Sequence, residues 1–140
     1  MVDTLGTHLL VEYHGCDLAV LDDIAAVRTM MRAAAEAAGA TVVAEVFQPF
    51  APQGITGVIV IEESHFSVHT WPECGYAAVD FYTCGDCVPQ RADAVLRQAL
   101  RPDHVEVMLV RRGLKDAAGS LRVEEHTHGP AEAEGRKAAG

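Results

Sequence analysis

The chain has 140 residues, and 49% of them are apolar, so the composition predicts one domain with its own hydrophobic core. Its 20 acidic residues outnumber 11 basic ones, which gives a formal net charge of -9. This balance argues against a nucleic-acid-binding protein, because no basic patch is available for the phosphate backbone.

The sequence predicts no membrane segment, because no run approaches the roughly 18 apolar residues of a spanning helix. The N-terminus lacks the charged start and apolar run of a signal peptide. We therefore expect a cytoplasmic protein, in which cysteines stay reduced and need an explanation other than disulfides. These cysteines are Cys16, Cys74, Cys84 and Cys87.

The predicted elements follow one another in the order β-α-β-β-β-α-β. Glycine boundaries, β-branched residues and helical spacing of apolar residues place them at residues 6–15, 22–40, 41–47, 58–71, 74–85, 89–101 and 104–113. Prolines and glycines predict a loop over residues 48–57. This order predicts an α/β fold, a two-layer α-β sandwich with a mostly antiparallel sheet and helices on one face. The other face also needs cover, and a second copy of the chain would supply it.

The composition changes after Gly113, so we expect residues 1–113 to form a single domain. Residues 114–140 are rich in Ala, Gly and charge, with too few large apolar side chains to offset the entropy of ordering. They are predicted to be a disordered tail. His126 and His128 could bind a metal there, but a solvated tail is the favoured interpretation.

The stretch "EESHFSVHTWPE", residues 62–73, concentrates reactive side chains. If it is a strand, alternation places two sets of residues on opposite faces of the sheet. One set is His65, Ser67, His69 and Trp71, and the other is Ser64, Phe66, Val68 and Thr70.

A metal site is one interpretation of this region, because "CGDC" (84–87) has the two-residue gap of a zinc half-site, with His65 and His69 as further ligands. The chain has no second Cys-x-x-Cys, and the two histidines would lie roughly 13 Å apart along a strand. A thioredoxin-like pair is disfavoured because "CGDC" does not open a predicted helix. We therefore predict no metal site.

A nucleophile is the second interpretation, with Ser64 or Cys84 activated by His69. Ser64 lies between Glu63 and His65, outside the G-x-S-x-G context of a serine hydrolase. The third interpretation is that these are ordinary strand residues, with Cys84 a small apolar side chain. Residue types alone leave the enzyme and the ordinary strand open.

Residues 63–86, "ESHFSVHTWPECGYAAVDFYTCGD", resemble the signature of the prokaryotic S-adenosylmethionine decarboxylases, which are pyruvoyl enzymes. "GTHLLVEYHGCD" (6–17) and "GATVVAEVFQPFAPQGITGVIVI" (39–61) resemble the same family. The resemblance spans about residues 5–112. It implies decarboxylation of S-adenosylmethionine, the step that supplies aminopropyl groups for spermidine synthesis.

The resemblance implies that the proenzyme cuts itself between Glu63 and Ser64. Ser64 Oγ would attack the Glu63 carbonyl, and β-elimination would leave a pyruvoyl group made from Ser64. His69 matches the processing base, in keeping with an imidazole that exchanges protons near neutral pH. Thr56 stands where the family usually has a serine that assists processing, so we expect slower cleavage. Its extra methyl group stiffens χ1.

The resemblance also assigns residues to catalysis and binding. Cys84 matches the general acid that protonates the product. Phe50 and Trp71 match aromatic contacts to adenine, and Glu73 matches the carboxylate that holds the ribose hydroxyls. The family's sites lie at a homodimer interface, which agrees with the uncovered sheet face.

Two alternatives remain open. One is a pyruvoyl decarboxylase of the same family that acts on arginine or ornithine, which need neither adenine nor ribose contacts. The other is an uncleaved, non-enzymatic binding domain, linked by a metal at Cys84 and Cys87. Cys74 and Cys87 depart from the family pattern, and a disulfide between Cys84 and Cys87 would remove the general acid.

Overall fold

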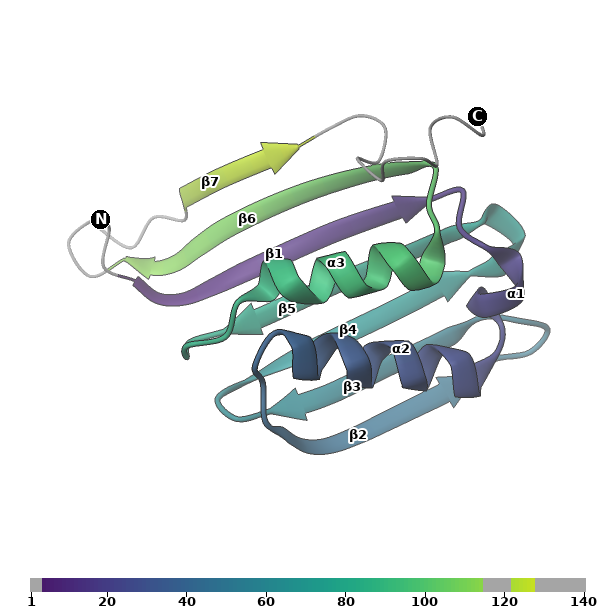
Figure 1. Ribbon diagram of the computed structural model, residues 1–140, viewed down its shortest axis with the longest axis horizontal. Coiled ribbons are helices and arrows are strands. Elements are labelled where there is room, and N and C mark those ends of the chain that lie inside the picture. The colour runs from purple at the N-terminus through teal and green to yellow at the C-terminus, as the bar shows by residue number, and fades with distance from the viewer. Residues whose placement is uncertain (1–3, 115–121, 128–140) are drawn as a thin grey trace.

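The structure, a computed structural model, describes residues 4–114 and 122–127. Seven strands form one sheet in the order β2-β3-β4-β5-β1-β6-β7, and every neighbouring pair is antiparallel (Figure 1). The strands are β1 Thr4–His14, β2 Val42–Pro49, β3 Ile55–Ile61, β4 Ser64–Trp71, β5 Tyr76–Thr83, β6 His104–Leu114 and β7 Arg122–Thr127.

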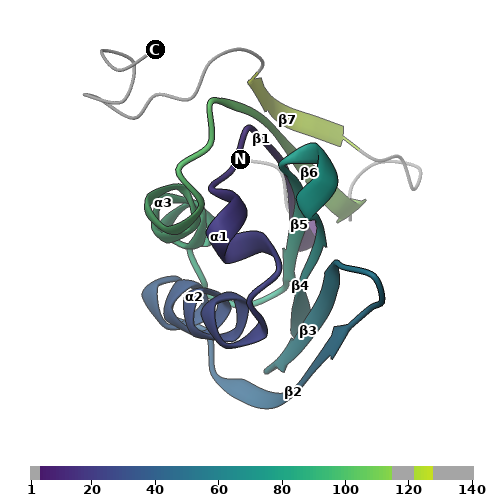
Figure 2. The ribbon, with the colours of Figure 1, turned by 90° about the vertical axis from the view of Figure 1, so that its right-hand side faces the viewer.

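Three α-helices cover one face of this sheet, as Figure 2 shows. They are α1 Leu18–Leu21, α2 Ile24–Ala37 and α3 Pro89–Leu100, and a 3₁₀ turn, η1 Pro72–Cys74, joins β4 to β5. The predicted two-layer α-β sandwich, with an antiparallel sheet and its helices on one face, is confirmed. In the described residues, no helix is long and apolar enough to cross a membrane.

The helices begin where the sequence supplies suitable first residues. The Asp23 carboxylate accepts a hydrogen bond from the Ala26 amide and caps α2, and Pro89 occupies the first turn of α3. The two longer helices each turn one apolar side toward the sheet. The buried residues are Val27, Met30, Met31, Ala34 and Ala35 of α2, and Ala92, Leu96 and Leu100 of α3.

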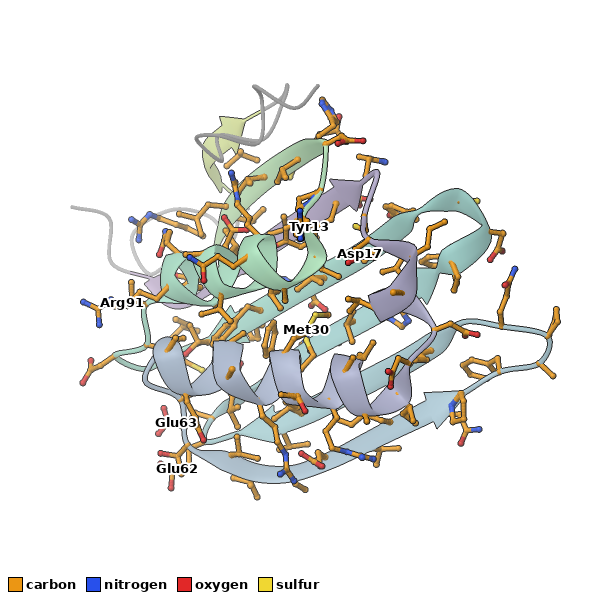
Figure 3. The ribbon with its side chains drawn as sticks, turned by 45° about the vertical axis from the view of Figure 1, so that its right-hand side comes forward. Tyr13, Asp17, Met30, Glu62, Glu63 and Arg91 are labelled. Atoms are coloured by element: carbon orange, nitrogen blue, oxygen red, sulfur yellow. The ribbon has the colours of Figure 1, made fainter. Side chains whose placement is uncertain are left out.

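The strands complete the core from the other side. On β4, Phe66 and Val68 are fully buried beneath the helices, and the Phe66 ring lies 4.9 Å from that of Phe81. Tyr13 of β1 is equally buried and donates a hydrogen bond to Asp93 of α3 at 2.5 Å (Figure 3). Burial and the adjacent Asp93 carboxylate raise the pKa of Tyr13 well above its usual value. This hydroxyl therefore ties α3 to the middle of the sheet.

The prediction of one strand over residues 58–71 is wrong. Two strands occupy this region, because the chain turns back at Glu62 and Glu63 between β3 and β4. Glu63 has a φ of 69°, in the left-handed region that glycine or asparagine usually occupies in such turns. The alternation predicted for 64–71 is confirmed, since Phe66, Val68 and Thr70 are buried while His69 and Trp71 are exposed.

The region predicted as a tail contains a strand. β7 pairs with β6, so the sheet extends beyond Gly113. The rest of the predicted tail, residues 115–121 and 128–140, lies outside the described residues. The metal ligation considered for His126 and His128 involves side chains that also lie outside the described part.

Candidate active site

The predicted cleavage junction lies in the turn between β3 and β4. Figure 3 shows Glu62 and Glu63 together at this turn, where β4 begins with Ser64. The left-handed backbone of Glu63 costs a non-glycine residue about 1–2 kcal/mol. Ser64 Oγ is buried and has no hydrogen-bond partner among the described residues. The junction therefore combines a strained residue with an unpaired nucleophilic hydroxyl.

Cys84 lies against the same junction. In the pairing of β4 with β5, His65 lies opposite Tyr82. The residues that follow β5 therefore lie next to the start of β4. The Cys84 thiol donates a hydrogen bond of 2.9 Å to the Glu63 carbonyl oxygen. This carbonyl is the one that Ser64 Oγ would attack, so the thiol is placed to stabilise negative charge on that oxygen.

The predicted binding residues form a second group, together with the predicted processing residues Thr56 and His69. Phe50, Thr56, His69, Trp71 and Glu73 line one cleft of about 290 Å³, together with Gln53, Gly54, Ile55 and Thr70. Thr56 Oγ1 and His69 Nδ1 are 3.0 Å apart and share a hydrogen bond. Trp71 stacks on Tyr76 with ring centres 5.2 Å apart, which holds the indole in place beside the cleft. The aromatic and carboxylate groups expected to bind a nucleoside thus lie in one cleft with the two residues expected to assist processing.

The two groups lie at opposite ends of β4. Ser64 begins this strand and Trp71 ends it, and His69 is five residues beyond Ser64, roughly 17 Å along an extended chain. In Figure 1 the turn between β3 and β4 and the loop between β2 and β3 lie at opposite ends of the strands. The sequence predicts that Ser64, Cys84 and His69 act together, and the structure separates His69 from the other two within one copy of the chain.

Cys87 lies close to the cleavage junction as well. It lines a separate cleft of about 250 Å³ with Glu62, Glu63, Asp86, Gly39, Thr41 and Gly85. All four cysteines are free thiols in this structure. Cys84 and Cys74 are exposed, Cys16 is buried, and Cys87 is half-buried against the core.

A polar cluster on the open sheet face was not predicted. Asp80 of β5 accepts hydrogen bonds from His8 at 2.6 Å, from His65 at 2.9 Å and from Ser67. Burial alone would raise the pKa of Asp80, but the hydrogen bonds from His8, Ser67 and His65 outweigh it and hold that pKa well below its usual range. His8 and Asp80 are far apart in the sequence, so only the strand order brings them together.

His8, His65 and Asp80 also have the spacing of metal ligands. However, the Arg112 guanidinium lies 3.1 Å from His8 Nδ1 and can only donate, so this nitrogen is the acceptor. The proton of His8 is then on Nε2, where it donates to Asp80. In this tautomer Nε2 has no lone pair for a metal, and the cluster is a closed hydrogen-bond network.

Comparisons with known proteins agree with this geometry. A sequence model of the S-adenosylmethionine decarboxylase family matches residues 7–113. The S-adenosylmethionine decarboxylase proenzyme of Methanococcus vannielii is 46% identical over 113 residues, covering 80% of this chain and 93% of that protein. The proenzyme of Thermotoga petrophila is 45% identical over 117 residues, covering 83% and 90%.

A solved structure is similar as well. The crystal structure of the adenosylmethionine decarboxylase from Aquifex aeolicus superposes with a TM-score of 0.75 at 33% sequence identity. The match covers 84% of this chain and 99% of that one. This chain therefore belongs to the S-adenosylmethionine decarboxylase family.

Proposed function

We propose that this chain is a self-processing decarboxylase that converts S-adenosylmethionine to its decarboxylated form and CO2, for spermidine biosynthesis. The similar proteins named above are S-adenosylmethionine decarboxylase proenzymes, and the match spans nearly their whole length. The single observation that carries the proposal is the contact between the Cys84 thiol and the Glu63 carbonyl, beside the unpaired hydroxyl of Ser64.

Processing would begin with attack of Ser64 Oγ on the carbonyl carbon of Glu63, which converts the amide to an ester. The Cys84 thiol supports this step, because its hydrogen bond strengthens as the carbonyl oxygen gains negative charge. Removal of the Ser64 α-proton then expels the Glu63 carboxylate. Tautomerisation and hydrolysis release ammonia and leave a pyruvoyl group at position 64.

The pyruvoyl carbonyl supplies an electron sink for loss of CO2 from a substrate bound through its amine. The residues around position 64 suit this group. Ser64 Oγ lies in a buried site without a partner among the described residues, and Cys84 offers a proton donor at the same place. Cys84 is then the general acid that returns a proton to the α-carbon of the product.

We propose that two copies of the chain complete each site. His69 is the processing base, yet it lies at the far end of β4 from the Ser64 that begins this strand. A two-fold axis that lies between the open faces of the two copies, parallel to the sheets and perpendicular to the middle of β4, sets the Ser64 end of one copy over the His69 end of the other. The open face carries exposed apolar side chains suited to such contact, among them Val46, Val58 and Val60.

Mixed dimers test this arrangement. Ser64→Ala leaves the His69 half intact, and His69→Ala leaves the Ser64 half intact. When the two variants are expressed together, chains that carry His69→Ala should be cleaved by His69 of the other copy. Each variant expressed alone should stay uncleaved. Failure of the pair to cleave would contradict a shared site.

The cleft between Phe50, Trp71 and Glu73 favours a nucleoside substrate. Aromatic faces suit both adenine and a sulfonium cation, and the carboxylate suits ribose hydroxyls. Arginine and ornithine offer none of these groups. The test is release of CO2 from S-adenosylmethionine, arginine and ornithine by the same preparation, and we expect release from S-adenosylmethionine alone. Faster release from arginine or ornithine would contradict the substrate assignment.

A further inference from the structure

Gln53 contacts the carboxylate expected to bind ribose. Its side chain comes from the loop between β2 and β3 and lines the cleft with Phe50 and Glu73. The Gln53 amide nitrogen donates a hydrogen bond of 3.1 Å to Glu73 Oε1. Both side chains are exposed, so this contact is not a by-product of core packing.

The loop is anchored so that Gln53 is held at this place. The next residue, Gly54, donates its amide to Asp22 at 2.9 Å, and its carbonyl accepts from the Phe50 amide at 2.8 Å. Gly54 has a φ of 105°, and a Cβ there would lie 3.1 Å from the Thr70 carbonyl oxygen. Only glycine fits this turn without strain.

The buried Thr70 hydroxyl fixes the other side of the loop. It accepts a hydrogen bond from the Ile55 amide at 2.9 Å and donates one to the Leu21 carbonyl at 2.8 Å. Thr70 belongs to β4, one residue before Trp71. The loop that carries Gln53 and the strand that leads to Glu73 are therefore linked by hydrogen bonds on both sides of the cleft.

The chemistry of the pair suits a vicinal diol. A glutamine is neutral, so it orients Glu73 and leaves the negative charge of the carboxylate in place. An arginine or lysine would cancel that charge. Among the described residues, none donates a hydrogen bond to Glu73 Oε2 or to Gln53 Oε1. The pair thus offers two adjacent acceptor oxygens, and a ribose 2′,3′-diol offers two adjacent donors.

We propose that Gln53 is a positioning and specificity residue, which orients Glu73 and completes a two-oxygen acceptor for the cis-diol of the nucleoside. This inference rests on the proposed function. The pair would recognise a ribose and reject a sugar without its hydroxyls, because the bound ligand would then cover two acceptor oxygens without offering them a donor.

The test compares adenosine with 2′,3′-dideoxyadenosine as calorimetric probes. The variants are Gln53→Ala and Gln53→Met, and methionine keeps the length of the side chain without its polar atoms. Gln90→Ala, at an exposed glutamine of α3, is the matched control. Loss of a hydrogen bond to a charged group should weaken adenosine binding about tenfold in both Gln53 variants. Binding of the dideoxy compound should not change.

Equal weakening of both probes, or no weakening of either, would overturn the role of Gln53. The kinetic counterpart is a KM for S-adenosylmethionine raised about tenfold by Gln53→Met, with kcat within about twofold of the unchanged protein. An unchanged KM also contradicts the inference. A wild-type protein that releases no CO2 from S-adenosylmethionine contradicts the proposed function instead, so the two failures are distinguishable.

Discussion

The thiol of Cys84 donates a hydrogen bond of 2.9 Å to the carbonyl oxygen of Glu63. Both residues lie at the end of the sheet where β4 begins, next to the buried hydroxyl of Ser64. In the function proposed above, this one side chain serves two steps: it stabilises the oxyanion during self-cleavage and donates a proton during turnover.

Cys84→Ala should therefore impair both steps. Loss of one oxyanion donor slows such reactions by about 100- to 1000-fold, and we expect a similar effect on cleavage between Glu63 and Ser64. Any cleaved protein should release almost no CO2. The measurements are a time course of chain cleavage and an assay of CO2 release. Cys74→Ala, at another exposed cysteine, is the control. Cleavage of Cys84→Ala at the normal rate would contradict the oxyanion role.

We predict that Cys87 makes the site sensitive to oxidation. Oxidised glutathione would take two electrons and two protons from the Cys84 and Cys87 thiols, which joins their sulfurs in a disulfide and leaves two molecules of reduced glutathione. The bridge removes the thiol that contacts Glu63, so CO2 release should fall and recover with dithiothreitol. Cys87→Ser should keep full activity in the oxidant. Equal rates with and without the reductant would rule out this bridge.

Thr56 holds the ring of His69. Its hydroxyl lies 3.0 Å from His69 Nδ1, and this hydrogen bond holds the orientation of the imidazole. Thr56→Val keeps the shape of the side chain but loses this partner, and we expect cleavage about tenfold slower. Thr56→Ser restores the hydroxyl without the extra methyl group and should cleave at least as fast as the unchanged protein. A gel time course after expression measures both, and equal rates for all three proteins would contradict this role.

Asp80 should govern stability in acid. Its hydrogen bonds lower its pKa in the folded state, so this contribution is present above the pKa of the unfolded state and is lost as pH falls. Asp80→Asn replaces one carboxylate oxygen by an amide donor, which faces either His8 and His65 or Ser67, and should lower the free energy of unfolding by about 1–3 kcal/mol at pH 7.

The difference between Asp80→Asn and the unchanged protein should shrink below about pH 4, where unfolded aspartate takes up a proton. Urea titrations at pH 7 and pH 3 measure both differences. Asp86→Asn, at an exposed aspartate, is the control. A constant difference across this range would show that Asp80 is not charged in the folded protein.

The alternation within residues 64–71 is predictable from the sequence because Phe66, Val68 and Thr70 face the core, while on the other face His69 and Trp71 are exposed and only Ser67 is buried. The turn at Glu62 and Glu63 was missed because neither residue is one of the glycines or asparagines that favour a left-handed backbone. The separation of Ser64 from His69 could have been found, since strand geometry alone sets five residues roughly 17 Å apart.

Contacts between strands that are far apart in the chain cannot be predicted from the sequence alone. The network of His8, His65 and Asp80 depends on β1 lying next to β5, and local patterns do not encode strand order. Gln53 was missed for another reason, because a neutral residue in a loop carries no chemical signal. Its role depends on the one hydrogen bond to Glu73.

The central claim is that Ser64 becomes the catalytic group by self-cleavage, and the intact mass of the purified protein tests it most directly. We predict two chains, one ending at Glu63 and one beginning at position 64, the second with the mass of a pyruvoyl group in place of the serine. Ser64→Ala should give a single uncleaved chain without activity. A single full-length chain from the unchanged protein, active in releasing CO2, would contradict the account.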